Sequence, residues 1–281
     1  MPAKLVQNNY GKSRVRLMKV ERHGDHHELQ NLNVKIALEG DFDEIHITGD
    51  NSKCLPTDTM KNTVYALAAQ TEGIEEIEAF GLRLARYFLK ENAQVSSVAI
   101  DIIEHKYTRI PVAGREHDHS FTKSGGEKRT TSVKASRDGE SVESGLEELT
   151  VIKTTKSGFA GYPKDKYTFL PETDDRIFCT QVKSRWRYSS PDVATEELWR
   201  GVRQTILETF ATHDSLSVQH TLYAMGEAVL DKHSEVVEIS FSLPNIHCLP
   251  VDVTRFGETE RHAIFLPTEE PHGLIEGRLT R

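Results

Sequence analysis

Cysteine is scarce in this 281-residue sequence, which contains only Cys54, Cys179 and Cys248. The three are far apart, odd in number and without CxxC spacing. They therefore predict neither a disulfide framework nor a zinc cluster, and a reducing compartment is expected.

Long apolar runs are also missing. No stretch reaches the roughly 18 apolar residues that a membrane-spanning helix needs. Residues 1–10 (MPAKLVQNNY) lack the apolar core of a signal peptide. The sequence therefore predicts a soluble protein with no membrane partner.

Basic charge is not in excess. Lys and Arg total 35 against 43 Asp and Glu, which gives a net charge of −8. Nucleic-acid binding requires a basic face, so this class of partner is not expected. A local basic pocket for a small anion remains compatible with the composition.

Several familiar catalytic motifs are absent. The sequence has no GxxxxGK[ST], GxGxxG or GxSxG segment, so neither a phosphate-binding loop nor a nucleophile elbow is predicted. His117 and His119 alternate along an expected strand, as metal ligands do. No carboxylate or cysteine set accompanies them or the pair His26-His27, so no metal site is predicted.

Hydrophobic periodicity divides the chain into two halves with the same order of elements. A period of two marks strands and a period near 3.6 marks helices. Strand–strand–helix–helix–strand–strand occurs twice, which favours an antiparallel α+β fold with two helices on one face of each sheet. The expected strands are near 15–20, 32–38, 98–110, 130–133, 149–152, 177–188, 236–241 and 263–266, and the expected helices are near 57–70, 77–92, 198–210 and 222–230.

Local chemistry sets the expected element boundaries. Thr57 begins a segment with N-cap chemistry, and Ser190-Pro191-Asp192 is expected to cap the third helix. Residues 123–146 are polar and rich in Gly and Ser, so a mobile loop is expected after 130–133. Pro244 is expected to end the strand that begins at 236.

One stretch carries a specific spaced pattern. Residues 149–176 read LTVIKTTKSGFAGYPKDKYTFLPETDDR, with Lys153, Ser157, Phe159, Tyr162 and Arg176 among the fixed positions. This pattern resembles the signature of the uricase (urate oxidase) family. Further segments of the chain agree with it, namely Tyr10-Gly11-Lys12, Asp50-Asn51-Ser52, Thr57-Asp58, His117-x-His119-Ser120-Phe121, Ser217-Val218-Gln219 and Asn245-x-His247.

The resemblance implies two tandem T-fold modules, expected at residues 1–140 and 141–281. It also implies a tunnel-shaped homotetramer with active sites at subunit interfaces and no metal or organic cofactor. The implied reaction converts urate, O2 and water to 5-hydroxyisourate and hydrogen peroxide. Residues 279–281 (LTR) differ from a Ser-Lys-Leu peroxisomal signal, so a bacterial, cytoplasmic enzyme is expected.

The resemblance assigns the binding of urate to five residues with suitable chemistry. Arg176 offers a planar two-pronged donor to the purine anion. Gln219, with the backbone of Val218, would bind the opposite purine edge. Phe159 would stack on the ring, and Asn245 would hold O2 or water above it.

The resemblance also assigns residues to proton transfer. Lys12 would act as the base, together with Thr57 of a neighbouring subunit and with His247 as a proton relay. Thr57 and Asp58 lie at a helix N-terminus, whose free N–H groups favour an anion, and would also contact the substrate.

Two other interpretations remain at this point. One is a pterin or GTP cyclohydrolase relative with the T-fold, although no Cys/His zinc ligand set can be assembled for it. The other is a non-catalytic purine-binding T-fold protein that keeps Phe159, Arg176 and Gln219. The presence of Lys12 and His247 weighs against a loss of turnover.

Overall fold

Antiparallel strands in chain order form the framework of the chain. The computed structural model describes residues 3–259 and 263–281. The elements are β1 (Tyr10–His23), β2 (His26–Gly40), α1 (Asp43–Ile47), α2 (Thr57–Gln70), α3 (Ile77–Glu91), β3 (Val95–Val112), β4 (Arg115–Ser136), β5 (Gly139–Lys153), β6 (Phe178–Tyr188), η1 (Pro191–Val193), α4 (Glu196–Thr212), α5 (Val218–Lys232), β7 (Val236–Pro250), η2 (Val253–Phe256) and β8 (Phe265–Thr280).

The chain divides into two compact units. The first unit comprises Met1–Gly145 together with Arg187–Glu196, and the second comprises Leu146–Trp186 and Glu197–Arg281. Segment 187–196, which begins in the last two residues of β6, thus belongs to the first unit. No helix within the described ranges is long and apolar enough to cross a membrane.

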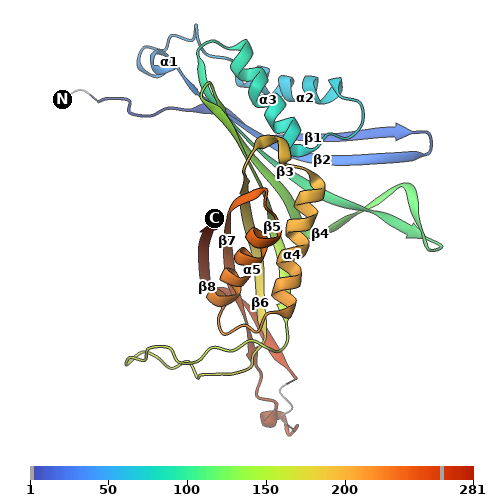
Figure 1. Cartoon of the computed structure of the whole chain (residues 1–281), viewed down its shortest axis with the longest axis vertical. Coiled ribbons are helices and arrows are strands. Elements are labelled where there is room, and N and C mark those ends of the chain that lie inside the picture. The colour runs from blue at the N-terminus through green and yellow to red at the C-terminus, as the bar shows by residue number, and fades with distance from the viewer. Residues whose placement is uncertain (1–2, 260–262) are drawn as a thin grey trace. The chain divides into compact units, whose positions relative to one another are not determined.

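In the first unit, β1 to β4 pair antiparallel in chain order. Helices α2 and α3 lie over one face of this sheet (Figure 1). The inward residues of β2 are at most 1% exposed, which confirms the predicted alternation; they are Leu32, Val34, Ile36 and Leu38. Phe80 and Leu84 of α3 are buried over the sheet, so the core lies between the helices and the strands.

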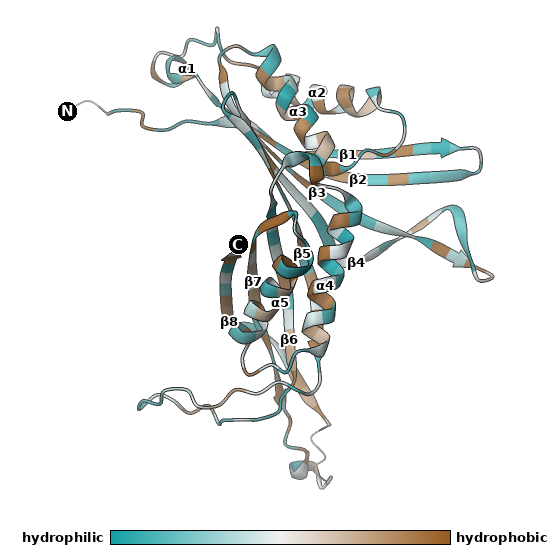
Figure 2. Ribbon diagram, viewed as in Figure 1, coloured by the Kyte–Doolittle hydropathy of each residue, from teal (hydrophilic) through white to brown (hydrophobic). Residues whose placement is uncertain are grey.

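In the second unit, the part of β5 from Leu146 onward and β6 to β8 are neighbours in chain order, and α5 packs on β7 and β8. Val202 and Ile206 of α4 and Met225 and Val229 of α5 are fully buried. Figure 2 shows hydrophobic stretches interrupted by hydrophilic ones along both helices, as expected for helices with one buried side. The predicted α+β class, with antiparallel strands and two long helices in each half of the chain, is confirmed.

Three boundary predictions in strands are wrong. The strand expected at 130–133 lies within β4, but the mobile loop expected after it is wrong, because only residues 137–138 separate β4 from β5. Polar residues are common in this stretch, and Arg129, Thr130, Thr131 and Ser144 among them are buried. β7 continues past Pro244 to Pro250, and β8 extends far beyond 263–266 because the two pair along their whole length.

Two predicted helix caps are also wrong. Pro56 is the N-cap of α2, so Thr57 is already the first helical residue and makes no capping bond. The Ser190 side chain accepts a hydrogen bond from the Asp192 N–H, but this caps the short η1, whereas α4 begins at Glu196. The predicted cap of α2 misses the N-cap by one residue, and the predicted cap of α4 lies six residues before the start of that helix.

A buried arginine organises charges in the first unit. Arg129 on β4 is 1% exposed, and its Nη2 contacts Glu78 Oε2 at 2.6 Å and Glu76 Oε2 at 2.8 Å. Its Nη1 lies 3.4 Å from Glu196 Oε2, a carboxylate that segment 187–196 brings to this unit. A buried charge is stable only when it is paired, so this segment is part of the unit's electrostatic core.

Candidate functional site

Lys12 lies on β1 at an irregular point of the strand. The β1–β2 register shifts between Lys12 and Val15, and Arg14 in this bulge has a φ of 57°. A Cβ atom on Gly11 would lie 1.8 Å from the Ile36 carbonyl oxygen, so only glycine allows this close approach of the strands. Bulges often occur beside active sites, where they redirect side chains, and Lys12 lies at the start of this one.

Thr57 and Asp58 form the first turn of α2, where backbone N–H groups lack partners within the helix. The Asp58 carboxylate accepts hydrogen bonds from Lys61 Nζ at 2.5 Å and from Asn62 Nδ2 at 2.9 Å. These bonds lower the pKa of Asp58, and the positive charge of Lys12 contributes a smaller lowering.

Lys12, Thr57 and Asp58 belong to the same unit of one chain. A single chain does not test the sequence-based expectation that Lys12 meets Thr57 from another subunit, which stays a prediction.

Phe159 and Arg176 are brought together in the second unit by backbone pairing. The Phe159 N–H donates to the Thr173 carbonyl at 2.7 Å, and the Arg176 N–H donates to the Ser157 carbonyl at 2.7 Å. The Arg176 Cζ then lies 5.3 Å from the centroid of the Phe159 ring. Arg176 is half-buried, and burial lowers its pKa. The Phe159 ring and the planar Arg176 guanidinium therefore lie next to each other.

Val218 and Gln219 are the first residues of α5. Ser217 caps this helix, and its side chain accepts a hydrogen bond from the His220 N–H at 3.1 Å. Val218 is buried at 4% exposure, whereas Gln219 is exposed. The helix start therefore offers unpaired backbone N–H groups beside a free side-chain amide, as the proposed purine edge requires.

A buried serine joins this helix start to the segment of Phe159. Ser215 is 2% exposed, its carbonyl accepts from the Gly158 N–H at 2.8 Å, and its N–H donates to the Lys156 carbonyl at 2.9 Å. Thr221 Oγ1 of α5 donates to Ser215 Oγ at 2.7 Å. Ser215 was not predicted from the sequence, because the capping signal of α5 belongs to Ser217 and no local pattern marks a serine two residues before it.

Asn245 and His247 lie on β7, where its pairing with β8 is irregular. Asn245 pairs with Gly273 and His247 with Thr268, with a register shift between them. Both predicted residues are half-buried. The Thr268 hydroxyl donates to the His247 carbonyl at 3.3 Å, which anchors the backbone beyond the irregularity.

The predicted residues thus form two groups. Hydrogen bonds connect the segments of Phe159, Arg176, Val218 and Gln219 within the second unit, and β7 of that unit carries the remaining pair, Asn245 and His247. Lys12, Thr57 and Asp58 form the other group, in the first unit.

The histidines with alternating spacing do form a cluster. The His117 and His119 rings are 4.5 Å apart edge to face, and His27 lies 5.6 Å from His119. Across the described ranges, no group of three or more His, Cys, Asp or Glu side chains has an arrangement that could hold a metal ion. The absence of a resident cofactor stays a prediction.

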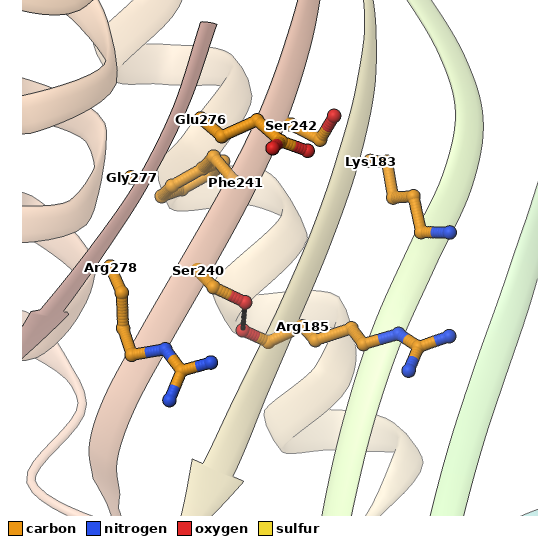
Figure 3. A pocket seen from close by; sticks show the side chains of 8 residues that line it. All are labelled: Lys183, Arg185, Ser240, Phe241, Ser242, Glu276, Gly277 and Arg278. Atoms are coloured by element: carbon orange, nitrogen blue, oxygen red, sulfur yellow. Dashed lines mark hydrogen bonds between the residues drawn. The ribbon is translucent and has the colours of Figure 1, made fainter.

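A cavity of about 520 Å³ lies on β6, β7 and β8 of the second unit, apart from these groups (Figure 3). Two of its basic residues share one carboxylate, because Glu147 contacts Lys183 at 3.0 Å and Arg185 at 3.5 Å. It contains none of the predicted site residues. Its lining residues are Lys183, Arg185, Ser240, Phe241, Ser242, Glu276, Gly277 and Arg278.

The chain is similar to the members of one protein family along nearly its whole length. The sequence model described as "Uricase" matches residues 8–134 and 142–276. The uricase of Arthrobacter globiformis is 42% identical over 99% of this chain and 90% of its own length, and that of Dictyostelium discoideum is 38% identical over 99% and 98%.

The crystal structure of the Arthrobacter globiformis uricase matches with a TM-score of 0.95 at 41% identity, covering 100% of this chain and 96% of that chain. A uricase structure from Bacillus fastidious matches with a TM-score of 0.83 at 26% identity, covering 97% and 93%. The chain belongs to the uricase family.

Proposed function

We propose that this chain oxidises urate with O2 and water to 5-hydroxyisourate and hydrogen peroxide. The observation that carries the proposal is the linked arrangement of Phe159, Arg176 and the start of α5. It joins an aromatic face, a planar cation and a helix start with a free amide in one hydrogen-bonded structure. These are the features that a flat, oxygen-rich anion needs for recognition.

Binding is assigned to the second-unit group. The Arg176 guanidinium neutralises one edge of the urate anion through paired hydrogen bonds, and Phe159 stacks on the ring. Gln219 and the Val218 N–H bind the opposite edge. Asn245 holds O2 or water above the purine plane.

Proton transfer is assigned to Lys12, Thr57 and His247. O2 has a triplet ground state, and singly charged urate gives up an electron reluctantly. Removal of a further proton makes the substrate a better electron donor, so a positioned base is the main catalytic requirement. Lys12 takes this proton, and Thr57 and His247 pass it on. No resident metal or organic cofactor enters this route.

In this proposal, each active site combines the first-unit group of one chain with the second-unit group of another. Lys12, Thr57 and Asp58 of one protomer complete the site that Phe159 and Arg176 begin on another. A homotetramer with closed symmetry would complete every site in this way.

One assay tests the proposed activity. Purified chain should remove the ultraviolet absorbance of urate while consuming one O2 and releasing one hydrogen peroxide per urate. Urate that binds without O2 consumption would identify a non-catalytic purine-binding protein instead. Failure to bind urate at all would overturn the proposal.

A further inference from the structure

An extended segment between β5 and β6 carries both Phe159 and Arg176. This segment, residues 157–176, is named the arm here; it runs outward from the sheet of the second unit (Figure 1). Its two sides are held together at three successive levels. These levels are the Phe159–Thr173 backbone pair, the Tyr162 hydroxyl donating to the Leu170 carbonyl at 2.5 Å, and the Lys164–Glu172 ion pair at 2.7 Å.

Tyr162 is the aromatic residue of the arm that stacks on the Phe159 ring. The two ring centroids are 4.8 Å apart and the ring planes differ by 17°, so the rings are stacked. Near-parallel stacks with offset centroids are a favourable aromatic geometry. The hydroxyl bond to Leu170 fixes the far end of the Tyr162 side chain. The ring of Tyr162 is therefore held at both ends.

The Phe159 ring needs a stacked neighbour to hold it, because the residues beside it in the sequence offer little apolar surface. Its neighbours Ser157 and Gly158 supply backbone bonds but no large apolar surface, and Ala160 is exposed. A phenyl ring rotates about two side-chain bonds, and its stacking surface is useful only in one orientation. A second ring against one face fixes that orientation before a ligand arrives.

We propose that Tyr162 is a positioning residue for urate. Its ring covers one face of Phe159, and the opposite face receives the purine beside Arg176. Tyr162 itself does not touch the substrate. This inference rests on the proposed function and adds a residue to its binding machinery.

The test compares Tyr162→Leu, which removes the aromatic plane, with Tyr162→Phe, which keeps the ring and loses only the bond to Leu170. Tyr167→Leu is the matched control, since Tyr167 lies on the same arm and is 74% exposed. Anaerobic urate binding, KM and kcat are measured for each, together with thermal unfolding. If Tyr162→Leu unfolds, Tyr162→Met fills more of the space and has the same expected result.

Loss of a stacked ring should raise KM and the anaerobic urate Kd of Tyr162→Leu by about fivefold to tenfold, in parallel. Its kcat should stay within about threefold, because the proton-transfer residues are untouched. Tyr162→Phe should recover most of the affinity, and Tyr167→Leu should match the wild type. A general folding defect would instead lower kcat at unchanged KM.

Two results overturn the inference alone while wild-type turnover persists. Wild-type KM in Tyr162→Leu would show that Phe159 needs no support. Tighter urate binding in that variant would show that Tyr162 occupies the face meant for the purine. A wild-type chain that neither binds nor oxidises urate would overturn the proposed function and this inference together.

Discussion

Arg176 combines a half-buried guanidinium with a backbone that is fixed by Ser157. Burial lowers its pKa, yet an arginine stays protonated at any physiological pH. The side chain is therefore a permanent cation in a partly desolvated position. Such a cation gains more from a paired anion than one in open water does.

Arg176→Lys should weaken urate binding markedly, although the charge is kept. Lysine loses the two-pronged donor geometry, and a hydrogen bond to a charged group contributes about 1.5–3 kcal/mol. The anaerobic Kd for urate should therefore rise by roughly tenfold to a hundredfold. Arg185→Lys on β6, where the arginine pairs with Glu147, is the control and should bind like the wild type. Unchanged affinity in Arg176→Lys would remove this residue from the binding edge.

Lys12→Met should separate catalysis from binding. Turnover should fall by roughly 10²–10⁴-fold, the usual contribution of a positioned base, while anaerobic urate binding stays nearly intact. The acidic limb of the pH–rate profile should move to higher pH in this variant, since hydroxide or water must replace the amine. His247→Ala should lose less, because water can bypass one relay member. Lys4→Met, at an exposed position before β1, is the control.

The bulge in β1 connects strand geometry with the position of that base. Gly11→Ala should destabilise the fold, because its Cβ would overlap the Ile36 carbonyl and force the strands apart. We expect a loss of about 1–3 kcal/mol in the free energy of unfolding. Turnover should also fall, since Lys12 is the next residue.

Gly273→Ala provides the control for Gly11→Ala, because the nearest atom to its added Cβ is at an ordinary 3.8 Å. Denaturant unfolding and kinetics of both variants check the expectation. Equal stability of the two would mean that β1 can shift at Gly11 without cost.

The connection between α4 and α5 should respond to acid. Burial, followed by the nearby His220 and Lys153, lowers the pKa of His213. The unfolded chain then binds this proton more readily than the folded one. The resulting stability is present above the ordinary histidine pKa of about 6.5 and is lost as the pH falls through it towards the folded value.

His213→Gln should therefore reduce the acid sensitivity of unfolding. Between pH of about 7.5 and 5.5, the wild type should lose more unfolding free energy than this variant does. His23→Gln, on an exposed histidine, is the control and should follow the wild type. An acid response identical in His213→Gln and the wild type would contradict the assignment.

Sequence periodicity predicted the elements whose faces are sharply divided. Leu32 to Leu38 alternate between buried and exposed positions, and the helix at 57–70 coincides with α2. The same method found the strand at 130–133 but failed directly after it, where β4 continues and β5 follows. Ser144 in β5 is buried although its side chain is polar. Burial of polar side chains depends on partners from other elements, which local composition does not reveal.

The sequence could predict those parts of the site whose residues lie near each other along the chain. Phe159 and Arg176 lie within one spaced pattern, so their association could be predicted before any fold was known. The contact of Ser215 with Gly158 joins segments nearly sixty residues apart, and no periodic pattern marks it. The placement of Lys12 and Asp58 in one unit likewise depends on how β1 packs against α2.

Mixing two inactive variants should restore activity if each site uses two copies of the chain. Lys12→Met removes the base from one group, and Arg176→Ala removes the cation from the other. With random assembly of equal amounts, roughly a quarter of the sites should contain both intact groups. Turnover is measured after dissociation and reassembly together. Wild-type chains treated identically are the control, and no recovery in the mixture would place both groups within one protomer.

Segment 187–196 affects how the two halves of the gene can be separated. A fragment ending near residue 140 would encode the first sheet with its two helices and Arg129, but not Glu196. The buried Arg129 would then lose one of its paired carboxylates. The complementary fragment would contain segment 187–196 without the unit to which this segment belongs. Although the element order suggests a duplication, each half has become dependent on the other. Gene fission or recombination at the midpoint would therefore be selected against.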